Sequence, residues 1–389
     1  MMKEKIQALA LEYKEALIQL SDQIYDHPEL GYEEFQSCKL HEDMLEKSGF
    51  QVERKFLGID TAFKATYASN QEGPTIAFLV EYDALPGIGH GCGHNILGTT
   101  STGAGIILKQ LIDDIGGKVI VFGTPAEETS GAKVPFVEKG AFDDVDVALV
   151  AHPNMSYNKS GKSLALEALQ FEYYGKTSHA ASSPEKGINA LDAVINTYNN
   201  INALRQQTQP DARIHGVIKE GGKAANVIPD YCVAQFYVRA QTKTYLIELV
   251  EKVKKCAEGA ALASGVKLEI SNYEYPYDNM VTNETMSVVF TEHLKDLGVD
   301  KILEPRQSFG SIDAGNVSQV CPTIHPYFDI TGDLKVAAHT KEFAESTKTQ
   351  YAYDNMMITI QALVRTAVDI IQDKELLLKI KEEFNNTEK

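Results

Sequence analysis

The chain has 389 residues, of which 43% are apolar and 23% charged, and this composition is typical of globular domains. Its net charge of −17 argues against nucleic acid or an anionic membrane as a partner. No apolar run approaches the roughly 18 residues that span a bilayer, and the first helix carries both charge signs, unlike a signal peptide. The five cysteines are scattered, which does not indicate a disulfide framework. We therefore expect a cytoplasmic protein.

The first 160 residues alternate between helix and strand patterns. Helices are expected over 2–25, 36–48 and about 97–113, and apolar strands over 75–81, 118–122 and 145–150. Short apolar strands separated by helices indicate a mostly parallel sheet that is covered on both faces. Ligands of such sheets bind at the loops that follow the carboxyl ends of the strands. The segments that follow strands in this way are 83–95, 124–128 and 151–153.

The pattern changes in the middle of the chain. Strands are expected over 163–175, 213–220, 231–240 and 266–274, with helices over 187–206 and 243–264. This βαββαβ order predicts a ferredoxin-like unit of ~110 residues, which is a usual domain size. A helix over 283–297, an α/β pattern, a long amphipathic helix over about 350–371 and a charged tail follow. We therefore expect one domain, built from 1–162 and 279–389, that is interrupted by an inserted domain over 163–278.

The most informative stretch is GHGCGHN, which places Cys92 and His94 two residues apart in a glycine-rich turn. Thiolate sulfur and imidazole nitrogen are ligands that zinc and similar metals prefer. The glycines let the backbone turn tightly, so that both side chains can face one point. Taken alone, the string also fits a structural zinc site, a reactive thiol or a buried turn. A catalytic metal needs further ligands.

Other segments of the same domain supply candidates for these ligands. Glu127 and Glu128 follow the second apolar strand, and adjacent glutamates there point in different directions. One can therefore bind metal while the other serves as a general base. His152 follows another strand, His339 lies in a loop before the last long helix, and Asp83 is placed to orient a ligand. Each is ordinary alone, but together they predict a metal site at one edge of the sheet.

Seven strings of the chain resemble, in order, the motifs of the amidohydrolase branch of the M20 peptidase family. They are EYDALPGIGHGCGHN, GTPAEE, ALVAHP, GKTSHAA, GGKAANVIPD, GSIDAGNVS and AAHTKEF, and they extend over almost the whole chain. This family of dinuclear metal enzymes includes aminoacylase-like enzymes, hippuricase and p-aminobenzoyl-glutamate hydrolases. The resemblance implies an α/β catalytic domain of the zinc-exopeptidase type with a mixed, mostly parallel sheet. It also implies that the inserted ferredoxin-like α+β domain is a lid and dimerisation domain.

The resemblance also implies a role for each matching residue. Cys92 would be a bridging metal ligand, and the other ligands would be His94, Glu128, His152 and His339. Glu127 would be the general base, Asp83 would orient a metal ligand from behind, and His179 would polarise the substrate carbonyl in its own or the partner subunit's site. The residues that would contact or surround the substrate are Asn226, Arg239, Gly310 and Ser311. A guanidinium such as that of Arg239 suits a carboxylate because the two can form paired hydrogen bonds.

The implied activity is hydrolysis of the amide bond of an N-acyl amino acid or a small dipeptide. It would need two divalent metal ions, with zinc expected from the thiolate ligand and manganese, cobalt or nickel as alternatives. A homodimer formed through the inserted domain is the expected assembly, and a tetramer is the alternative. Asn95, Gly123-Thr124 and the segment 311–316 depart from the commoner pattern and resemble the p-aminobenzoyl-glutamate hydrolase and dipeptidase-like subgroup. The preferred acyl group and amino acid stay open.

Two other hypotheses compete with that of a metal-dependent amidohydrolase. Cys92 could be a nucleophile activated by His94, but then the two glutamates, His152 and His339 have no role. The chain could instead be a non-catalytic binding protein on the same scaffold, although no ligand or base is replaced in this sequence. His90, the first histidine of the glycine-rich string, is not expected to bind metal under any of these hypotheses.

Overall fold

The computed structural model describes residues 2–305 and 310–387, and the chain divides into two compact units. The main unit contains residues 2–162, 280–305 and 313–387, and the inserted unit contains residues 163–279 and 310–312. The short segment 310–312 belongs to the inserted unit although it lies far along the chain. Its Gly310 carbonyl accepts a hydrogen bond of 2.9 Å from the Leu164 backbone N–H.

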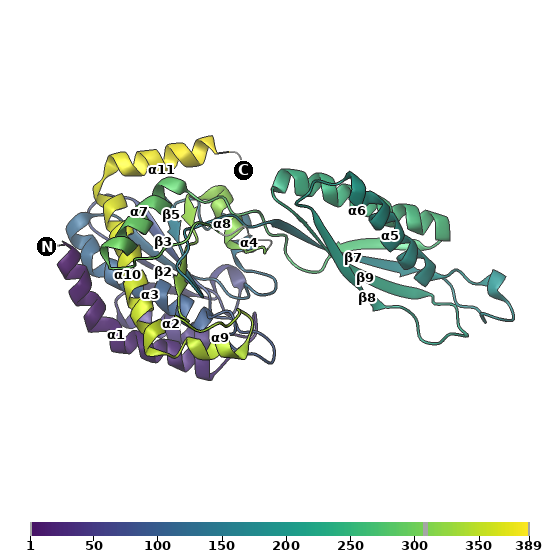
Figure 1. Ribbon diagram of the computed structural model, residues 1–389, viewed down its shortest axis with the longest axis horizontal. Coiled ribbons are helices and arrows are strands. Elements are labelled where there is room, and N and C mark those ends of the chain that lie inside the picture. The colour runs from purple at the N-terminus through teal and green to yellow at the C-terminus, as the bar shows by residue number, and fades with distance from the viewer. Residues whose placement is uncertain (1, 306–309, 388–389) are drawn as a thin grey trace. The chain divides into compact units, whose positions relative to one another are not determined.

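The main unit is built on a six-stranded sheet in the order β1-β2-β4-β3-β5-β11 (Figure 1). The strands are β1 (Gln51–Arg54), β2 (Phe63–Ala68), β3 (Thr75–Val80), β4 (Lys118–Gly123), β5 (Val147–Leu149) and β11 (Thr323–Ile324). The pairs β4–β3, β3–β5 and β5–β11 are parallel, whereas β1 and β2 add an antiparallel edge. The predicted mixed, mostly parallel sheet is therefore confirmed. The strands β1 and β2 are not predicted from the sequence, because their polar residues leave no continuous apolar run.

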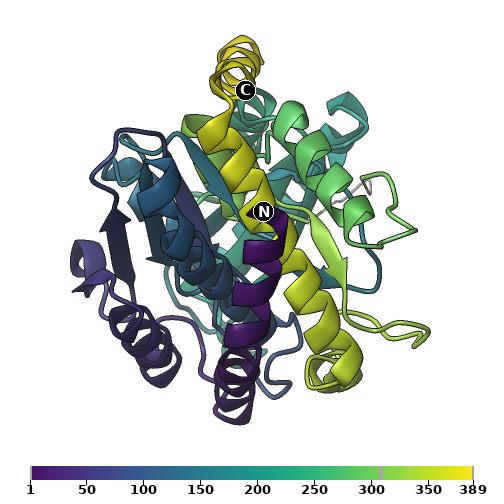
Figure 2. The same cartoon turned by 90° about the vertical axis from the view of Figure 1, so that its left-hand side faces the viewer.

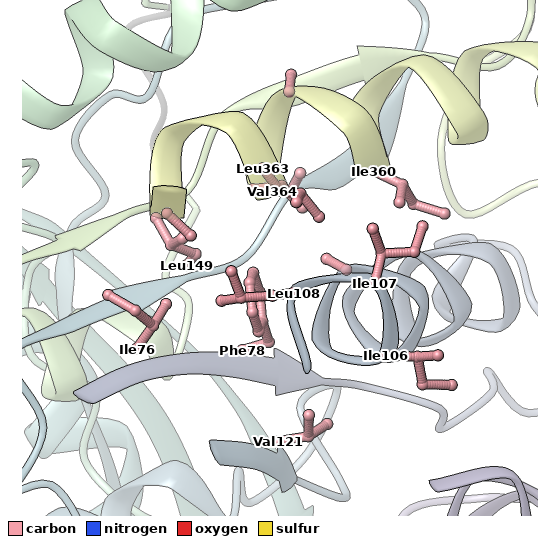
Figure 3. Close-up of a cluster of buried hydrophobic side chains, with 14 of the residues drawn as sticks. Ile76, Phe78, Ile106, Ile107, Leu108, Val121, Leu149, Ile360, Leu363 and Val364 are labelled. Carbon is pink, nitrogen blue, oxygen red and sulfur yellow. The ribbon is translucent and has the colours of Figure 1, made fainter. Parts of the chain in front are cut away.

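Helices cover both faces of this sheet. The helices α1 (Met2–Asp26), α3 (His94–Ile115) and α10 (Gln350–Gln372) pack together on one face (Figure 2). The helices α4 (Lys133–Glu138) and α8 (Ala314–Val320) lie on the other face. Figure 3 shows Leu108 of α3 between Phe78 of β3 and Leu363 of α10. Burial of these apolar side chains is the main favourable term that fixes the helices on the sheet.

The main unit contains further helices and strands. They are α2 (Phe35–Lys47), β6 (His152–Asn154), α7 (Glu284–Asp296), β12 (Tyr327–Asp329), α9 (Lys341–Ser346) and α11 (Lys374–Asn386). The strands β6 and β12 pair with each other in parallel. The charged tail of the sequence forms the helix α11, because Ile380 is buried against the core and Asp373 caps the first turn.

The inserted unit follows the predicted βαββαβ order. It contains β7 (Ala165–Tyr174), α5 (Ala190–Leu204), β8 (Arg213–Glu220), β9 (Tyr231–Ala240), α6 (Lys243–Ser264) and β10 (Lys267–Asn272). The strands form an antiparallel sheet in the order β10-β7-β9-β8, which is the ferredoxin-like arrangement. The two helices pack on one face of this sheet around a separate hydrophobic core.

Long helices of the chain are too polar for a membrane span. The helix α1 has 25 residues but carries charged side chains of both signs along its length. Among residues 2–305 and 310–387, no helix is long and apolar enough to cross a bilayer. The cytoplasmic location expected from the sequence stays a prediction.

Candidate metal centre

The glycine-rich turn after β3 leads directly into α3. Gly93 caps this helix with a φ of +78°, a conformation that glycine adopts without strain. A Cβ atom at this position would lie 2.6 Å from Cγ of Pro153, so a larger residue would collide with β6. The turn therefore holds Cys92 and His94 close to the strand that begins with His152.

Asp83 fixes two of the predicted ligands. One carboxylate oxygen lies 2.8 Å from Nδ1 of His94, and the other accepts a hydrogen bond of 2.9 Å from the backbone N–H of Glu128. Burial by itself would raise the pKa of Asp83, but the neighbouring His94 holds that pKa below its usual value. Because Nδ1 is occupied by Asp83, the Nε2 atom of His94 is the one directed into the centre.

A first group of donor atoms comes from Cys92, His94 and His152. These atoms all lie within 4.8 Å of one another, and Sγ of Cys92 is 3.5 Å from Nε2 of His152. The Nδ1 atom of His152 lies 2.7 Å from the Pro153 carbonyl oxygen, which leaves Nε2 to face the thiol. Sulfur and nitrogen donors at this spacing suit a tetrahedral ion such as zinc.

A second group comes from Cys92, Glu128 and His339. Its donor atoms also lie within 4.8 Å of one another, and Nε2 of His339 is 3.7 Å from Oε1 of Glu128. His339 has a left-handed backbone with a φ of +65°, and its N–H donates to the Gly91 carbonyl oxygen at 2.8 Å. The loop that carries His339 is thus attached to the glycine-rich turn. The structure brings all five predicted ligands together, and Cys92 is the member common to both groups.

Two buried atoms indicate that these groups fit a metal ion. Nε2 of His94 and Oε1 of Glu128 are buried, and neither has a hydrogen-bond partner among the described residues. Burying polar atoms without partners is costly, and a bound cation would satisfy both. The donor set of one thiol, three imidazoles and one carboxylate is also the kind that borderline metals prefer.

Glu127 lies beside the first group and is directed differently from Glu128. Its Oε2 atom is 4.0 Å from Nε2 of His94, and its side chain is 11% exposed. Burial, followed by the charges of Glu81 and Glu128, raises the pKa of Glu127 well above its usual value. A carboxylate with a raised pKa can accept a proton and later return it, as a general base and acid must.

Comparison with known proteins assigns the chain to a family. The chain is 39% identical to the mouse Xaa-Arg dipeptidase over 96% of its own length and 90% of that protein, and 37% identical to the human Xaa-Arg dipeptidase. Residues 167–264 match the peptidase dimerisation domain of the M20 family. The chain belongs to the M20 peptidase family.

More distant matches agree with the fold of an M20 peptidase. One of the subunits of the p-aminobenzoyl-glutamate hydrolase of Escherichia coli is 34% identical over 72% of this chain and 62% of its own length. A dinuclear metal-binding M20 peptidase of Bacillus subtilis, at 20% identity, superposes with a TM-score of 0.70 over 93% of this chain and 99% of its own. An aminobenzoyl-glutamate utilization protein of Klebsiella pneumoniae, at 19% identity, reaches 0.76 over 94% of this chain and 98% of its own.

A buried charge cluster, which the sequence does not predict, lies next to the centre of this M20 peptidase. Lys133 is fully buried, and its Nζ atom lies 2.9 Å from Glu81 and 2.7 Å from Asp313. Glu81 in turn lies 3.4 Å from Nε2 of His94. Burial would raise the pKa of Glu81, but Lys133 and then His94 bring it below its usual value. The position of Glu81, two residues before Asp83, is the one available signal in the sequence, whereas nothing marks Lys133.

The inserted unit brings His179 and Asn226 together. The backbone N–H of Ala180 donates to the Asn226 carbonyl oxygen at 3.0 Å, and His179 forms an isolated bridge with Val227. Both His179 and Asn226 are exposed. Nδ1 of His179 accepts from two backbone N–H groups, at 3.3 and 3.2 Å, so the tautomer that fits carries its proton on Nε2. The imidazole can therefore donate a hydrogen bond from an exposed position.

The other predicted substrate residues of the inserted unit form a separate group. The Nη1 atom of Arg239 donates a hydrogen bond of 3.3 Å to Oγ of Ser311, and Gly310 directly precedes that serine. Asn226 lies five residues before Tyr231, the first residue of β9, whereas Arg239 is the last residue but one of that strand. The eight steps from Tyr231 to Arg239 correspond to about 27 Å of strand. The structure therefore does not bring these two groups together within one chain.

Proposed function

We propose that this M20 peptidase hydrolyses the amide bond of a small dipeptide or N-acyl amino acid, using two divalent metal ions that share Cys92. The observation that carries this proposal is that one thiol belongs to both ligand groups. The predicted base, Glu127, lies next to the first group. The named activities of the relatives, which act on dipeptides and p-aminobenzoyl-glutamate, support the same reaction class.

The residues of the chain divide the chemistry between them. When bound, the ions would polarise the substrate carbonyl and make water more acidic. Glu127 accepts the proton of the attacking water and delivers it to the nitrogen of the leaving amine. Asp83 keeps His94 and the backbone of Glu128 in place throughout. His179 donates from Nε2 to the carbonyl oxygen as negative charge develops there.

The distance between the Arg239–Ser311 pair and the His179–Asn226 pair in the inserted unit supports a site made from two copies of the chain. An extended dipeptide spans only about 7 Å, so it cannot contact two groups at opposite ends of β9. Arg239 with Ser311 and His179 with Asn226 can serve one substrate only if they come from different subunits. We therefore infer a homodimer in which His179 and Asn226 act in the partner's site, through the region that matches the dimerisation domain.

Dipeptides are the first substrates to test. The mouse and human relatives that cover almost the whole chain are named Xaa-Arg dipeptidases. The p-aminobenzoyl-glutamate enzyme is matched over a smaller share. Zinc is the first metal to test because of the thiolate, with manganese, cobalt and nickel as alternatives.

The electrostatics of Cys92 disfavour the nucleophile hypothesis. A nucleophilic cysteine needs a lowered pKa, as a neighbouring base or cation provides. Here burial, together with the carboxylate of Glu128, raises the pKa of the Cys92 thiol. Full removal of metal ions separates the two hypotheses, because a thiol nucleophile would survive chelation and would be lost on alkylation.

The experiment that tests the proposal is a screen of metal-reconstituted protein for amine release. The panel contains dipeptides with C-terminal Arg, Lys or Ala, β-alanyl dipeptides, and N-acetyl, N-benzoyl and p-aminobenzoyl amino acids. We expect hydrolysis of at least one class, with loss on chelation and recovery when metal is restored. Absence of product from every member of the panel would contradict the proposed function.

A further inference from the structure

The backbone directly before the two glutamates has an unusual conformation. Ala126 is buried and has a φ of +64°, in the left-handed region that residues with a Cβ atom rarely adopt. Such a conformation persists only where neighbouring structure enforces it, and it is commonly found at functional sites. The residues that follow are Glu127, which lies beside the first group of donor atoms, and Glu128, which belongs to the second.

A segment from far earlier in the chain lies against this point. Oε1 of Glu34 accepts a hydrogen bond of 2.8 Å from the backbone N–H of Ala126. A Cβ atom on Gly31 would lie 2.9 Å from that of Ala126, so the two backbones are in close contact. The Tyr32 hydroxyl donates to the Ser130 carbonyl oxygen, beyond the second glutamate. The segment 31–34 therefore contacts the glutamate loop on both sides of its functional residues.

A buried glutamate at position 34 would be energetically unfavourable if its side chain only filled space. It is fully buried, and within the described part of the chain it forms no ion pair with Lys, Arg or His. Burial, together with the charge of Asp83, raises the pKa of Glu34 to about 8. An apolar side chain would fill the same space without this cost. The feature that an apolar residue could not supply is the acceptor for the Ala126 N–H.

We propose that Glu34 is a positioning residue that holds the Ala126 backbone in its left-handed conformation and so aims Glu127 at the substrate and Glu128 at the metal. Asp83 performs the matching task two residues later, where it accepts the Glu128 N–H at 2.9 Å. Two buried carboxylates from separate segments thus fix alternate N–H groups of one loop. The inference rests on the proposed function for the roles of the two glutamates, but not for the geometry of Ala126.

The test compares Glu34→Met with Glu34→Gln. Methionine removes the acceptor, whereas glutamine keeps an oxygen in the place of Oε1. We expect Glu34→Met to lower kcat by about tenfold to a hundredfold with a smaller change in KM, because small misplacements of catalytic groups have effects of this size. We expect Glu34→Gln to stay within about threefold of the unaltered protein, and the exposed neighbour in Glu33→Met serves as a matched control.

A second substitution separates positioning from a general loss of stability. Glycine adopts positive φ without strain, so Ala126→Gly added to Glu34→Met should restore part of kcat. Loss of kcat in Glu34→Met that Ala126→Gly does not restore would overturn the proposal, as would an unchanged kcat in a folded Glu34→Met protein.

Hydrogen exchange in the peptide that contains residues 124–131 provides a readout independent of catalysis. We expect faster exchange there in Glu34→Met, but not in Glu34→Gln or Glu33→Met, whether or not a substrate is known. Unchanged exchange in Glu34→Met would overturn the positioning role even if the proposed function is correct. Faster exchange in a protein that hydrolyses no substrate would contradict the proposed function and leave the role of Glu34 intact.

Discussion

The two units of this M20 peptidase present their candidate functional residues in opposite ways. In the main unit, His94, Asp83 and Glu81 are buried and joined by short polar contacts. In the inserted unit, His179 and Asn226 lie exposed on loops, and each is linked to its surroundings mainly through backbone hydrogen bonds.

This difference has a physical meaning. A buried polar cluster is expensive unless every member is satisfied, so it is built where geometry must be fixed in advance of binding. Exposed side chains on loops cost little to place, and they become ordered when a substrate or a second subunit covers them. The candidate residues of the main unit therefore have the character of a preorganised centre, whereas under the proposed function those of the inserted unit act only after two chains assemble.

The largest effect is expected at Glu127 and Glu128, two adjacent glutamates of the main unit that have different proposed roles. Glu127→Gln should lower kcat by about 10²–10⁴-fold while bound metal is retained, because only the proton acceptor is lost. Glu128→Gln should instead lower the affinity for metal. Parallel measurement of kcat and of bound metal by mass spectrometry distinguishes the pair. Near-normal turnover in Glu127→Gln would show that another residue is the base.

Substitution of His179 should lower activity, because of its proposed role as a hydrogen-bond donor. It should leave the stability of the protein unchanged, because the side chain is exposed. His179→Ala should lower kcat by about 10²–10³-fold, as removal of an oxyanion donor does, while the melting temperature and metal content stay unchanged. Mixing this variant with Glu127→Gln tests the two-copy site. If His179 acts in the partner's site, mixed dimers contain one intact site, and activity should reappear. Activity that stays absent after proven subunit exchange would place both residues in the same subunit's site.

Substitution of Asp83 tests how strongly metal binding depends on the hydrogen bond between Asp83 and His94. Asp83→Asn keeps the shape but weakens the hydrogen bond to His94, so the affinity for metal should fall by about 10–100-fold. Excess metal should restore most of the activity, and this recovery separates the substitution from loss of the base. A metal titration followed by hydrolysis rate measures both. Unchanged metal affinity would mean that Asp83 does not orient His94.

The smallest effect concerns assembly through the inserted unit. The strand β8 lies at an edge of its sheet and exposes Val217 to 55%, whereas Leu262 of α6 is 86% exposed. If edges pair in the dimer, Val217→Lys should shift the protein toward monomer by sedimentation, with little change in melting temperature. Leu262→Lys is the matched control, and a shift caused by that variant alone would place the interface on the helices.

The elements that are predicted best from the sequence are those that carry their own local pattern. The strand β9 and the helix α6 have the predicted bounds, because amphipathic periodicity and clear turns delimit them. The strands β6 and β12 are not predicted from the sequence, because three residues are too few to show a period. The grouping of the five candidate ligands could be predicted because Cys92, His94, Glu128 and His152 follow strands, and because their motifs and that of His339 resemble one family.

The supporting residues could not be predicted in the same way. Lys133, Glu81 and Asp313 meet only after the chain folds, and a lone lysine in a sequence is typical of a solvated surface. The left-handed backbone of Ala126 is also invisible in the sequence, because alanine gives no signal for positive φ. Local sequence patterns indicate the candidate ligands and the candidate base, whereas the contacts between distant segments that position them appear only in the folded chain.

The most direct test of the account is the number of divalent ions bound per chain as metal is titrated into metal-free protein, with hydrolysis followed in parallel. We predict two ions per chain for the unaltered protein and for Cys256→Ser, with activity that rises as the sites fill. In Cys92→Ser both ions should bind much more weakly, because both ligand groups lose the same donor. Two tightly bound ions in Cys92→Ser, or full activity in the metal-free protein, would contradict a centre bridged by Cys92.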